Sequence, residues 1–116
     1  MATVLRKRSD LSPDEIGEIF KRIKVFEFKG TKVRTVKKGN QTWVVFADLC
    51  KALGYKNPSS QKKYVSENDM TTLDIGLKNV LANCINRRGL MYLTMISDKP
   101  DRKEFADWAV KNIFQS

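Results

Sequence analysis

The chain has 116 residues, with 41% hydrophobic residues, 30% charged residues, six Gly and three Pro. This length and balance are typical of one globular domain, and they exclude a disordered chain, a collagen-like repeat, a disulfide scaffold and a membrane span. The net charge is +9, and its excess is concentrated in residues 21–63, which carry twelve Lys and Arg against two acids. Two cysteines and the absence of His exclude Ser-His and Cys-His catalytic pairs and most zinc sites, and they favour an intracellular, reduced setting.

The start of the chain combines a basic tail with a helix signal. Residues 1–10 are predicted to form a mobile basic tail, and no apolar segment follows that would make it a secretory signal. Residues 11–116 are predicted to form a single domain. Ser12 and Pro13 begin a capping-box pattern, and apolar residues at helical spacing extend the predicted helix over residues 12–24.

The next segment is rich in Val, Thr and aromatic residues, and it predicts strands over residues 25–28, 33–37 and 41–46. Between the last two, Gly39 and Asn40 predict a tight hairpin turn. Basic side chains cluster on or near this hairpin, namely Arg34, Lys37 and Lys38. A basic hairpin tip can contact a nucleic-acid backbone or keep an edge strand from aggregating, and the sequence leaves both readings open.

A short helix is predicted over residues 47–53, ending at Gly54, which suits the left-handed conformation of a helix C-terminus. Cys50 lies on its apolar face and is expected to be a small buried side chain rather than a reactive thiol. Asp48 lies in the first turn, where a carboxylate complements the helix dipole, and as a lone acid it is no catalytic signal.

A second short helix is predicted over residues 58–65, because Asn57 and Pro58 form a cap-plus-proline start. The backbone N–H groups and short polar side chains at its start make a candidate phosphate seat. The alternative is a plain solvated helix. The candidate contacts in this region are Lys56, Ser59, Lys62 and Lys63.

Residues 64–116 carry seven Lys and Arg and seven acids and are therefore neutral. They predict an extended, hairpin-like segment over residues 71–85 with a turn at Gly76, and a last helix that begins near Asp101. The apolar run over residues 89–96 fits either a helix or a strand. The predicted core consists of Trp43, Phe46, Leu53, Phe105 and Trp108.

Arg87 and Arg88 form the one basic pair in this neutral half. Near a helix start, their guanidinium groups would suit contact with phosphate or guanine. The alternative is an ion pair with a neighbouring acidic segment, and the sequence does not decide between the two.

Several motifs, read in order, resemble the Bro-N domain, the N-terminal domain of baculovirus Bro proteins and of many phage antirepressors. The resemblance covers residues 33 to about 113, and each motif alone is weak while the ordered set is fairly specific. Its motifs are Val33-Arg34-Thr35-Val36, Gly39, Trp43 to Cys50, Ala52-Leu53-Gly54-Tyr55, Asn57-Pro58, Asn86, Gly89-Leu90, Tyr92-Leu93, Ser97, Pro100, Phe105 and Trp108.

The resemblance implies a compact α+β fold, here a small antiparallel β-hairpin sheet packed with four to five helices, and it assigns residues 89–96 to a helix. The chain departs from the family at Arg87-Arg88, where a dipeptide of the Glu-Ser type is usual. The predicted helix over residues 12–24 lies outside the common family core. Family antirepressors usually carry a further C-terminal domain, so we expect either a fragment or a stand-alone form.

The family is associated with DNA binding and viral gene regulation. Together with the basic segment, this resemblance predicts a regulatory protein that binds duplex DNA mainly through phosphate contacts. The alternative is an interaction module that captures a repressor protein; an enzyme is not expected, and a nuclease is disfavoured because the acidic clusters fit helix starts. No cofactor or metal is expected, a homodimer is a further candidate assembly, and the expected location is the host-cell cytoplasm, or the nucleus for a eukaryotic virus.

The expected DNA contacts form one positive strip, in which the hairpin tip and the second short helix share a side of the molecule and the arginine pair extends it. The set consists of Arg34, Lys37, Lys38, Lys56, Ser59, Lys62, Lys63, Arg87 and Arg88. No helix shows the spacing of Arg, Asn and Gln that would read bases.

Overall fold

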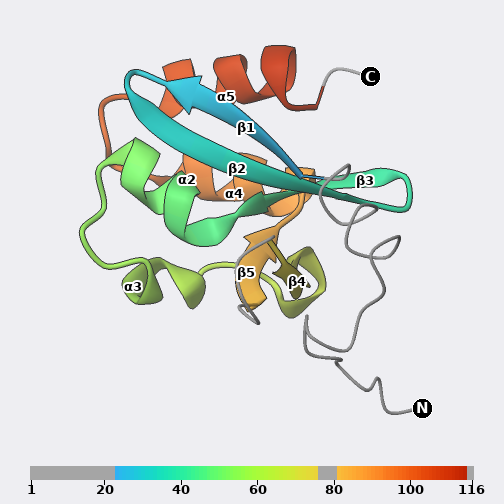
Figure 1. Cartoon of the computed structure of the whole chain (residues 1–116). Helices are drawn as coiled ribbons and strands as arrows, with labels where there is room; N and C mark the ends of the chain where they lie inside the picture. Colours follow the sequence, from blue (N-terminus) through green and yellow to red (C-terminus); the bar gives the residue numbers. More distant parts are fainter. Residues whose placement is uncertain (1–22, 76–80, 115–116) are drawn as a thin grey trace.

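A computed structural model of the chain describes residues 23–75 and 81–114. Its centre is one five-stranded sheet in the order β1-β2-β3-β5-β4, and every neighbouring pair is antiparallel (Figure 1). The α+β class expected from the resemblance is therefore confirmed. The strands are β1 (Ile23–Phe28), β2 (Thr31–Lys38), β3 (Gln41–Val45), β4 (Met70–Asp74) and β5 (Leu81–Ile85).

The helices α2, α4 and α5 pack on one face of this sheet and enclose the main core. The apolar run over residues 89–96 lies in α4, as the resemblance implied. The predicted helix over residues 58–65 is wrong in length, because only four residues are helical and tight i-to-i+3 turns follow through Val65. The helical segments are α2 (Phe46–Leu53), α3 (Ser59–Lys62), the 3₁₀ helix η2 (Glu67–Asp69), α4 (Arg87–Ile96) and α5 (Arg102–Asn112).

Two predicted glycine positions are confirmed. Lys38 pairs with Gln41, so Gly39 and Asn40 form a two-residue turn, and Gly39 has a φ of 62°. Gly54 follows α2 with a φ of 100°, and its N–H donates to carbonyl groups of the last helical turn. Both backbones lie in the left-handed region, where a residue without Cβ is favoured.

The predicted helix over residues 12–24 is wrong at its end, because β1 already begins at Ile23. Ile23 and Lys24 pair with Val36 and Thr35 of β2. The hydrogen-bonding edge of a long strand thus outweighs the helical spacing of the apolar residues. The remainder of that prediction, the tail over residues 1–10 and the predicted turn at Gly76 lie outside the described residues.

The predicted core is correct for three of its five residues. Phe46, Leu53 and Phe105 are buried, whereas Trp43 and Trp108 are only half-buried. The ring of Trp108 covers the edge of the main core and lies 5.5 Å from that of Phe105, centre to centre. Trp43 belongs to a second, smaller cluster on the opposite face of the sheet, because side chains alternate along β3.

Candidate nucleic-acid interface

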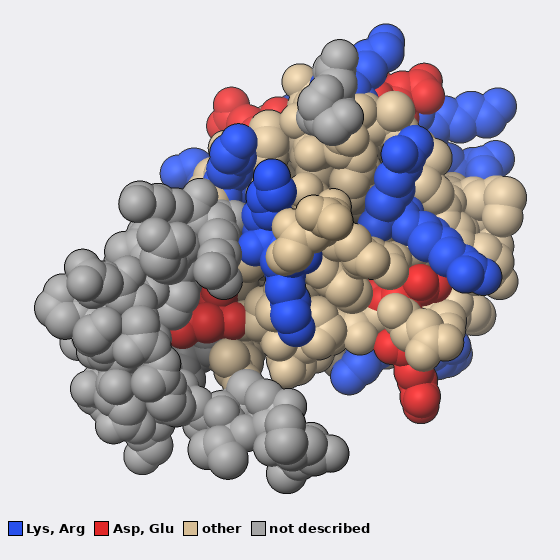
Figure 2. Space-filling view, turned by 90° about the vertical axis from the view of Figure 1, so that its right-hand side faces the viewer, with Lys and Arg blue, Asp and Glu red and all other residues tan. Residues whose placement is uncertain are grey.

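A basic groove lies where the β2–β3 hairpin, the start of α4 and the end of α5 meet. It has a volume of about 920 Å³. Its walls carry four exposed cations, Lys24, Lys37, Arg87 and Arg88, which come from three separate elements. Figure 2 looks onto this end of the molecule and shows Lys and Arg side chains on both sides of a band of uncharged surface.

Among the described residues that line the groove, Asp69 of η2 is the one acid. This carboxylate is only 7% exposed, and it accepts a hydrogen bond from the Nδ2 of Asn86 at 3.2 Å. Within residues 23–75 and 81–114, none of the four cations forms an ion pair. The walls therefore offer unneutralised positive charge, and for the arginine pair the described residues give no support to the alternative of a neighbouring ion pair.

The start of α4 fixes the position of the arginine pair. The Oδ1 of Asn86 accepts from the N–H of Gly89 at 2.9 Å, and the N–H of Asn86 donates to the carbonyl of Asp69 at 3.0 Å. A Cβ at position 89 would lie 2.6 Å from Cγ1 of Ile85, so this turn of the helix needs glycine to approach the sheet. The cap and the close contact together fix the backbone from which Arg87 and Arg88 project at the groove.

Carboxamide side chains also line the groove, and sequence reasoning missed them. They come from four segments that are far apart in the chain, so no local spacing could have revealed them. Within the described part of the chain the side chains of Asn40, Gln41 and Asn68 make no hydrogen bond, whereas those of Asn86 and Asn112 do. Free carboxamides can pair with base edges, which the sequence had not indicated. The carboxamides are Asn40, Gln41, Asn68, Asn86 and Asn112, and the missed cation is Lys24.

Strand alternation divides the hairpin lysines. Lys37 lies two positions after Thr35 in β2, so the two side chains share one face of the strand, and both residues line the groove. Lys38 lies two positions after Val36 and shares its face, and Val36 belongs to the cluster on the opposite face of the sheet. The expected pair thus contributes one cation to the groove and one to the other side of the hairpin.

The candidate phosphate seat at α3 lies elsewhere. Ser59, Lys62 and Lys63 border a separate hollow beside β4 and β5. In Figure 1, α3 and the tip of the β2–β3 hairpin lie toward opposite ends of the view, so the structure does not form the single strip expected from the sequence. Lys56 is exposed and lines neither this hollow nor the groove.

The backbone N–H groups at the start of α3 already donate hydrogen bonds within the chain. The N–H of Ser59 donates to Oδ1 of Asn57 at 3.1 Å, and that of Ser60 donates to the carbonyl of the same residue at 3.2 Å. The N–H of Gln61 donates to the carbonyl of Pro58. A helix of four residues, with these donors occupied, does not offer the free N–H groups on which the predicted seat depended.

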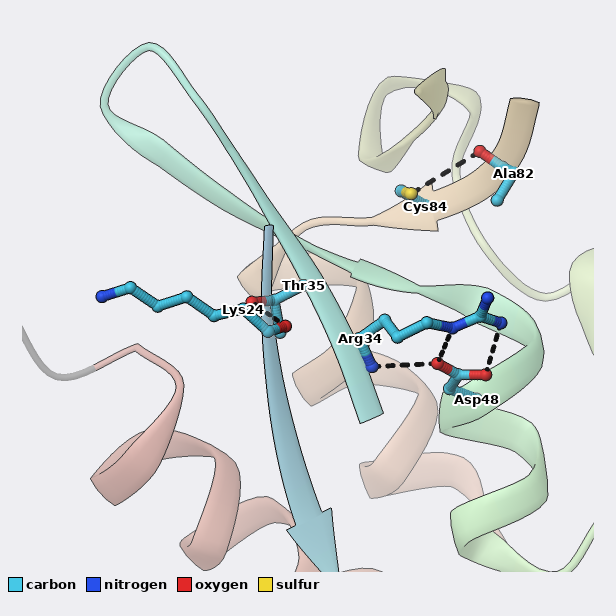
Figure 3. A network of polar contacts seen from close by, with 6 residues as sticks. All are labelled: Lys24, Arg34, Thr35, Asp48, Ala82 and Cys84. Carbon is cyan, nitrogen blue, oxygen red and sulfur yellow. Dashed lines mark hydrogen bonds and ion pairs between the residues drawn. The ribbon is translucent and has the colours of Figure 1, made fainter. Parts of the chain in front are cut away.

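The Arg34 side chain forms an ion pair with the carboxylate of Asp48 (Figure 3). Its Nε and Nη2 donate to the two carboxylate oxygens at 2.8 and 2.9 Å, and its backbone N–H donates to Oδ2 at 2.9 Å. Arg34 pairs with Val25 of β1, but the β2–β3 ladder begins only at Thr35. On the side of β3 the Asp48 carboxylate therefore accepts from this N–H in place of a strand carbonyl. The hydrogen bond with Asp48 raises the pKa of Arg34. We therefore assign Arg34 a structural role.

The two cysteines are buried in the core. Burial raises the pKa of Cys50 to about 12 and that of Cys84 to about 11, so both remain protonated at neutral pH.

Among the described residues, no three His, Cys, Asp or Glu side chains are grouped so that they could hold a metal ion. Nor does that part of the chain contain a helix with the length and apolar character needed to cross a membrane.

The fold and the groove define a small α+β domain with a cationic groove that carboxamide side chains line. Residues 32–115 match the family model of the BRO family, N-terminal domain. The chain therefore belongs to the BRO family, as the motifs suggested. Comparison with curated proteins and with solved structures gave no match.

Proposed function

We propose that this protein is a viral or phage regulatory protein that binds duplex DNA through the basic groove. The observation that carries the proposal is the convergence of four exposed cations from β1, β2 and α4 on one groove. Within the described residues these cations form no ion pair, and one acid lines the groove. Membership of the BRO family supports the regulatory class. The proposed role is binding rather than catalysis, and it places the protein in the host-cell cytoplasm or nucleus.

The proposed contacts are mainly electrostatic. Lys24, Lys37, Arg87 and Arg88 each neutralise a phosphate, which fixes the register of the protein on the duplex. The exposed hairpin tip adds Asn40 and Gln41, whose free carboxamides reach toward base edges. A two-stranded ribbon fits the major groove of B-DNA, which is about 12 Å wide.

We predict that Lys37→Ala/Arg87→Ala weakens binding more than Lys62→Ala/Lys63→Ala, although both variants remove two exposed positive charges. Fluorescence anisotropy with one random duplex at several salt concentrations measures the difference. With four phosphate contacts, the log of the affinity of the wild type falls against log salt with a slope of roughly −4. The first variant should lower this slope to roughly −2, and the matched control should leave it nearly unchanged.

Two results would contradict the proposal. A wild-type salt slope near zero would remove electrostatic DNA binding altogether. Equal losses in the two variants would show that total charge, and not the groove, governs binding.

Capture of a repressor protein is the alternative role, and it predicts co-purification with the repressor that the duplex does not compete away.

A further inference from the structure

Helix α4 has an apolar outer face. Its inner side chains, Leu90 and Leu93, are fully buried in the core. The opposite side of the helix carries Tyr92 and Met95, which are 46% and 65% exposed, whereas Met91 packs partly against the main core. A surface helix normally places polar residues on this side, whereas a helix that is apolar on all sides is normally buried.

This outer face is the main cluster of exposed apolar side chains on the described surface. Ile96, which is 42% exposed, extends it toward the end of α4. The other large exposed apolar side chains, Val25, Tyr64 and Leu81, lie on separate parts of the fold. The inner side of α4 packs on α5, β3 and η2, whereas the side chains of the stripe are 42–65% exposed. We name Tyr92, Met95 and Ile96 the α4 stripe.

Opposite charges stand at the two ends of the α4 stripe. Arg88 precedes Tyr92 by four residues and Met95 by seven, so it lies on the same side of the helix. Asp98 follows just beyond the last turn, and no charged residue lies between the two in sequence. Both are exposed, and within the described residues neither forms an ion pair.

We propose that the α4 stripe binds a second copy of this chain in an antiparallel, two-fold arrangement. A two-fold axis brings a patch onto itself, so the patch must be complementary to its own inverted copy. Antiparallel pairing superposes the two apolar stripes and sets Arg88 beside the partner's Asp98, twice. Parallel pairing would instead set the two Arg88 side chains against each other.

The expected dimer is weak. A helix of ten residues is about 15 Å long, so the α4 stripe buries less than the roughly 800 Å² per partner of a standard interface. We expect dissociation constants of about 1–100 μM. Arg88 lies between the stripe and the basic groove, so it can contact phosphate in the monomer, which prevails below these concentrations. In the dimer Arg88 faces the second copy, and Lys24, Lys37 and Arg87 remain for nucleic acid. The inference does not depend on the proposed function, because its test measures oligomeric state without DNA.

A charge-reversal experiment tests the pairing. Sedimentation velocity over about 5–500 μM should show a concentration-dependent dimer of the wild type. Arg88→Glu alone and Asp98→Arg alone place like charges at both ends, and each should weaken the dimer by about tenfold. An equimolar mixture of the two variants should dimerise about as well as wild type, because both ends of the heterodimer then carry opposite charges.

A second pair of variants tests whether the α4 stripe itself, rather than surface hydrophobicity in general, causes dimerisation. Met95→Asp should abolish the dimer, whereas Val25→Asp, at a position that is 56% exposed on β1, should leave it intact. A wild type that stays monomeric throughout overturns the proposal and leaves the stripe for a different protein. A mixture that fails to restore dimerisation overturns the antiparallel arrangement.

Discussion

Phe105→Ala should lower the free energy of unfolding by about 3–5 kcal/mol. The side chain is fully buried at the centre of the main core, where its ring lies 5.1 Å from that of Phe28. Its removal therefore leaves a cavity between α5 and the turn that joins β1 to β2. Lys29 of this turn also forms ion pairs with Asp101 and Glu104 of the α5 region, but these exposed contacts are too weak to compensate.

Urea unfolding followed by circular dichroism measures this loss. Domains of this kind have a total stability of about 5–15 kcal/mol, so this loss is a large fraction of the total and should clearly lower the midpoint. Tyr64→Ala is the matched control, because Tyr64 is also aromatic but 48% exposed, and it should cost less than about 0.5 kcal/mol. Equal midpoints for the two variants would show that α5 does not pack as described.

Asp48→Ala should lower the free energy of unfolding by about 2–4 kcal/mol. The substitution removes all three hydrogen bonds to Arg34 and leaves a backbone N–H of β2 without an acceptor. The guanidinium is about one third exposed, so water recovers part of its loss. Asp48→Asn keeps an acceptor for that N–H and should cost less than the alanine variant in the same urea titration.

The same pair of variants tests the role of Arg34. Because Arg34 does not line the basic groove, we expect the DNA affinity of folded Asp48→Asn to be close to that of wild type. A clear gain in affinity would show that the released arginine reaches phosphate, and it would contradict a purely structural role.

The features of the fold that could be predicted are those with local causes. The turn at Gly39 and the end of α2 at Gly54 follow from backbone freedom at single residues. The start of β1 could not be predicted, because the helical spacing of apolar residues continues to Ile23 and only pairing with β2 decides against it. The short length of α3 likewise depends on turns after Lys62 that carry no strong signal.

The candidate site was harder to predict because it joins distant segments. Lys37 and Arg87 are fifty positions apart, and only the sheet and the cap at Asn86 bring them to one groove. The sequence placed Lys62 and Lys63 in the same strip as Lys37 and Arg87, but the fold places these two lysines beside another hollow. Arg34 also belongs to the basic segment. Its pairing with Asp48 could not be predicted, because this pairing depends on where the β2–β3 ladder ends.

Backbone amide chemical shifts, followed by NMR during titration with a random duplex, test the basic groove most directly. The account predicts the largest changes over residues 37–41, 87–89 and 112–114, which line or border the groove. Amides of residues 59–63, around α3, should change little at the same ratio of DNA to protein. The largest changes at residues 59–63, with the groove amides unmoved, would contradict it.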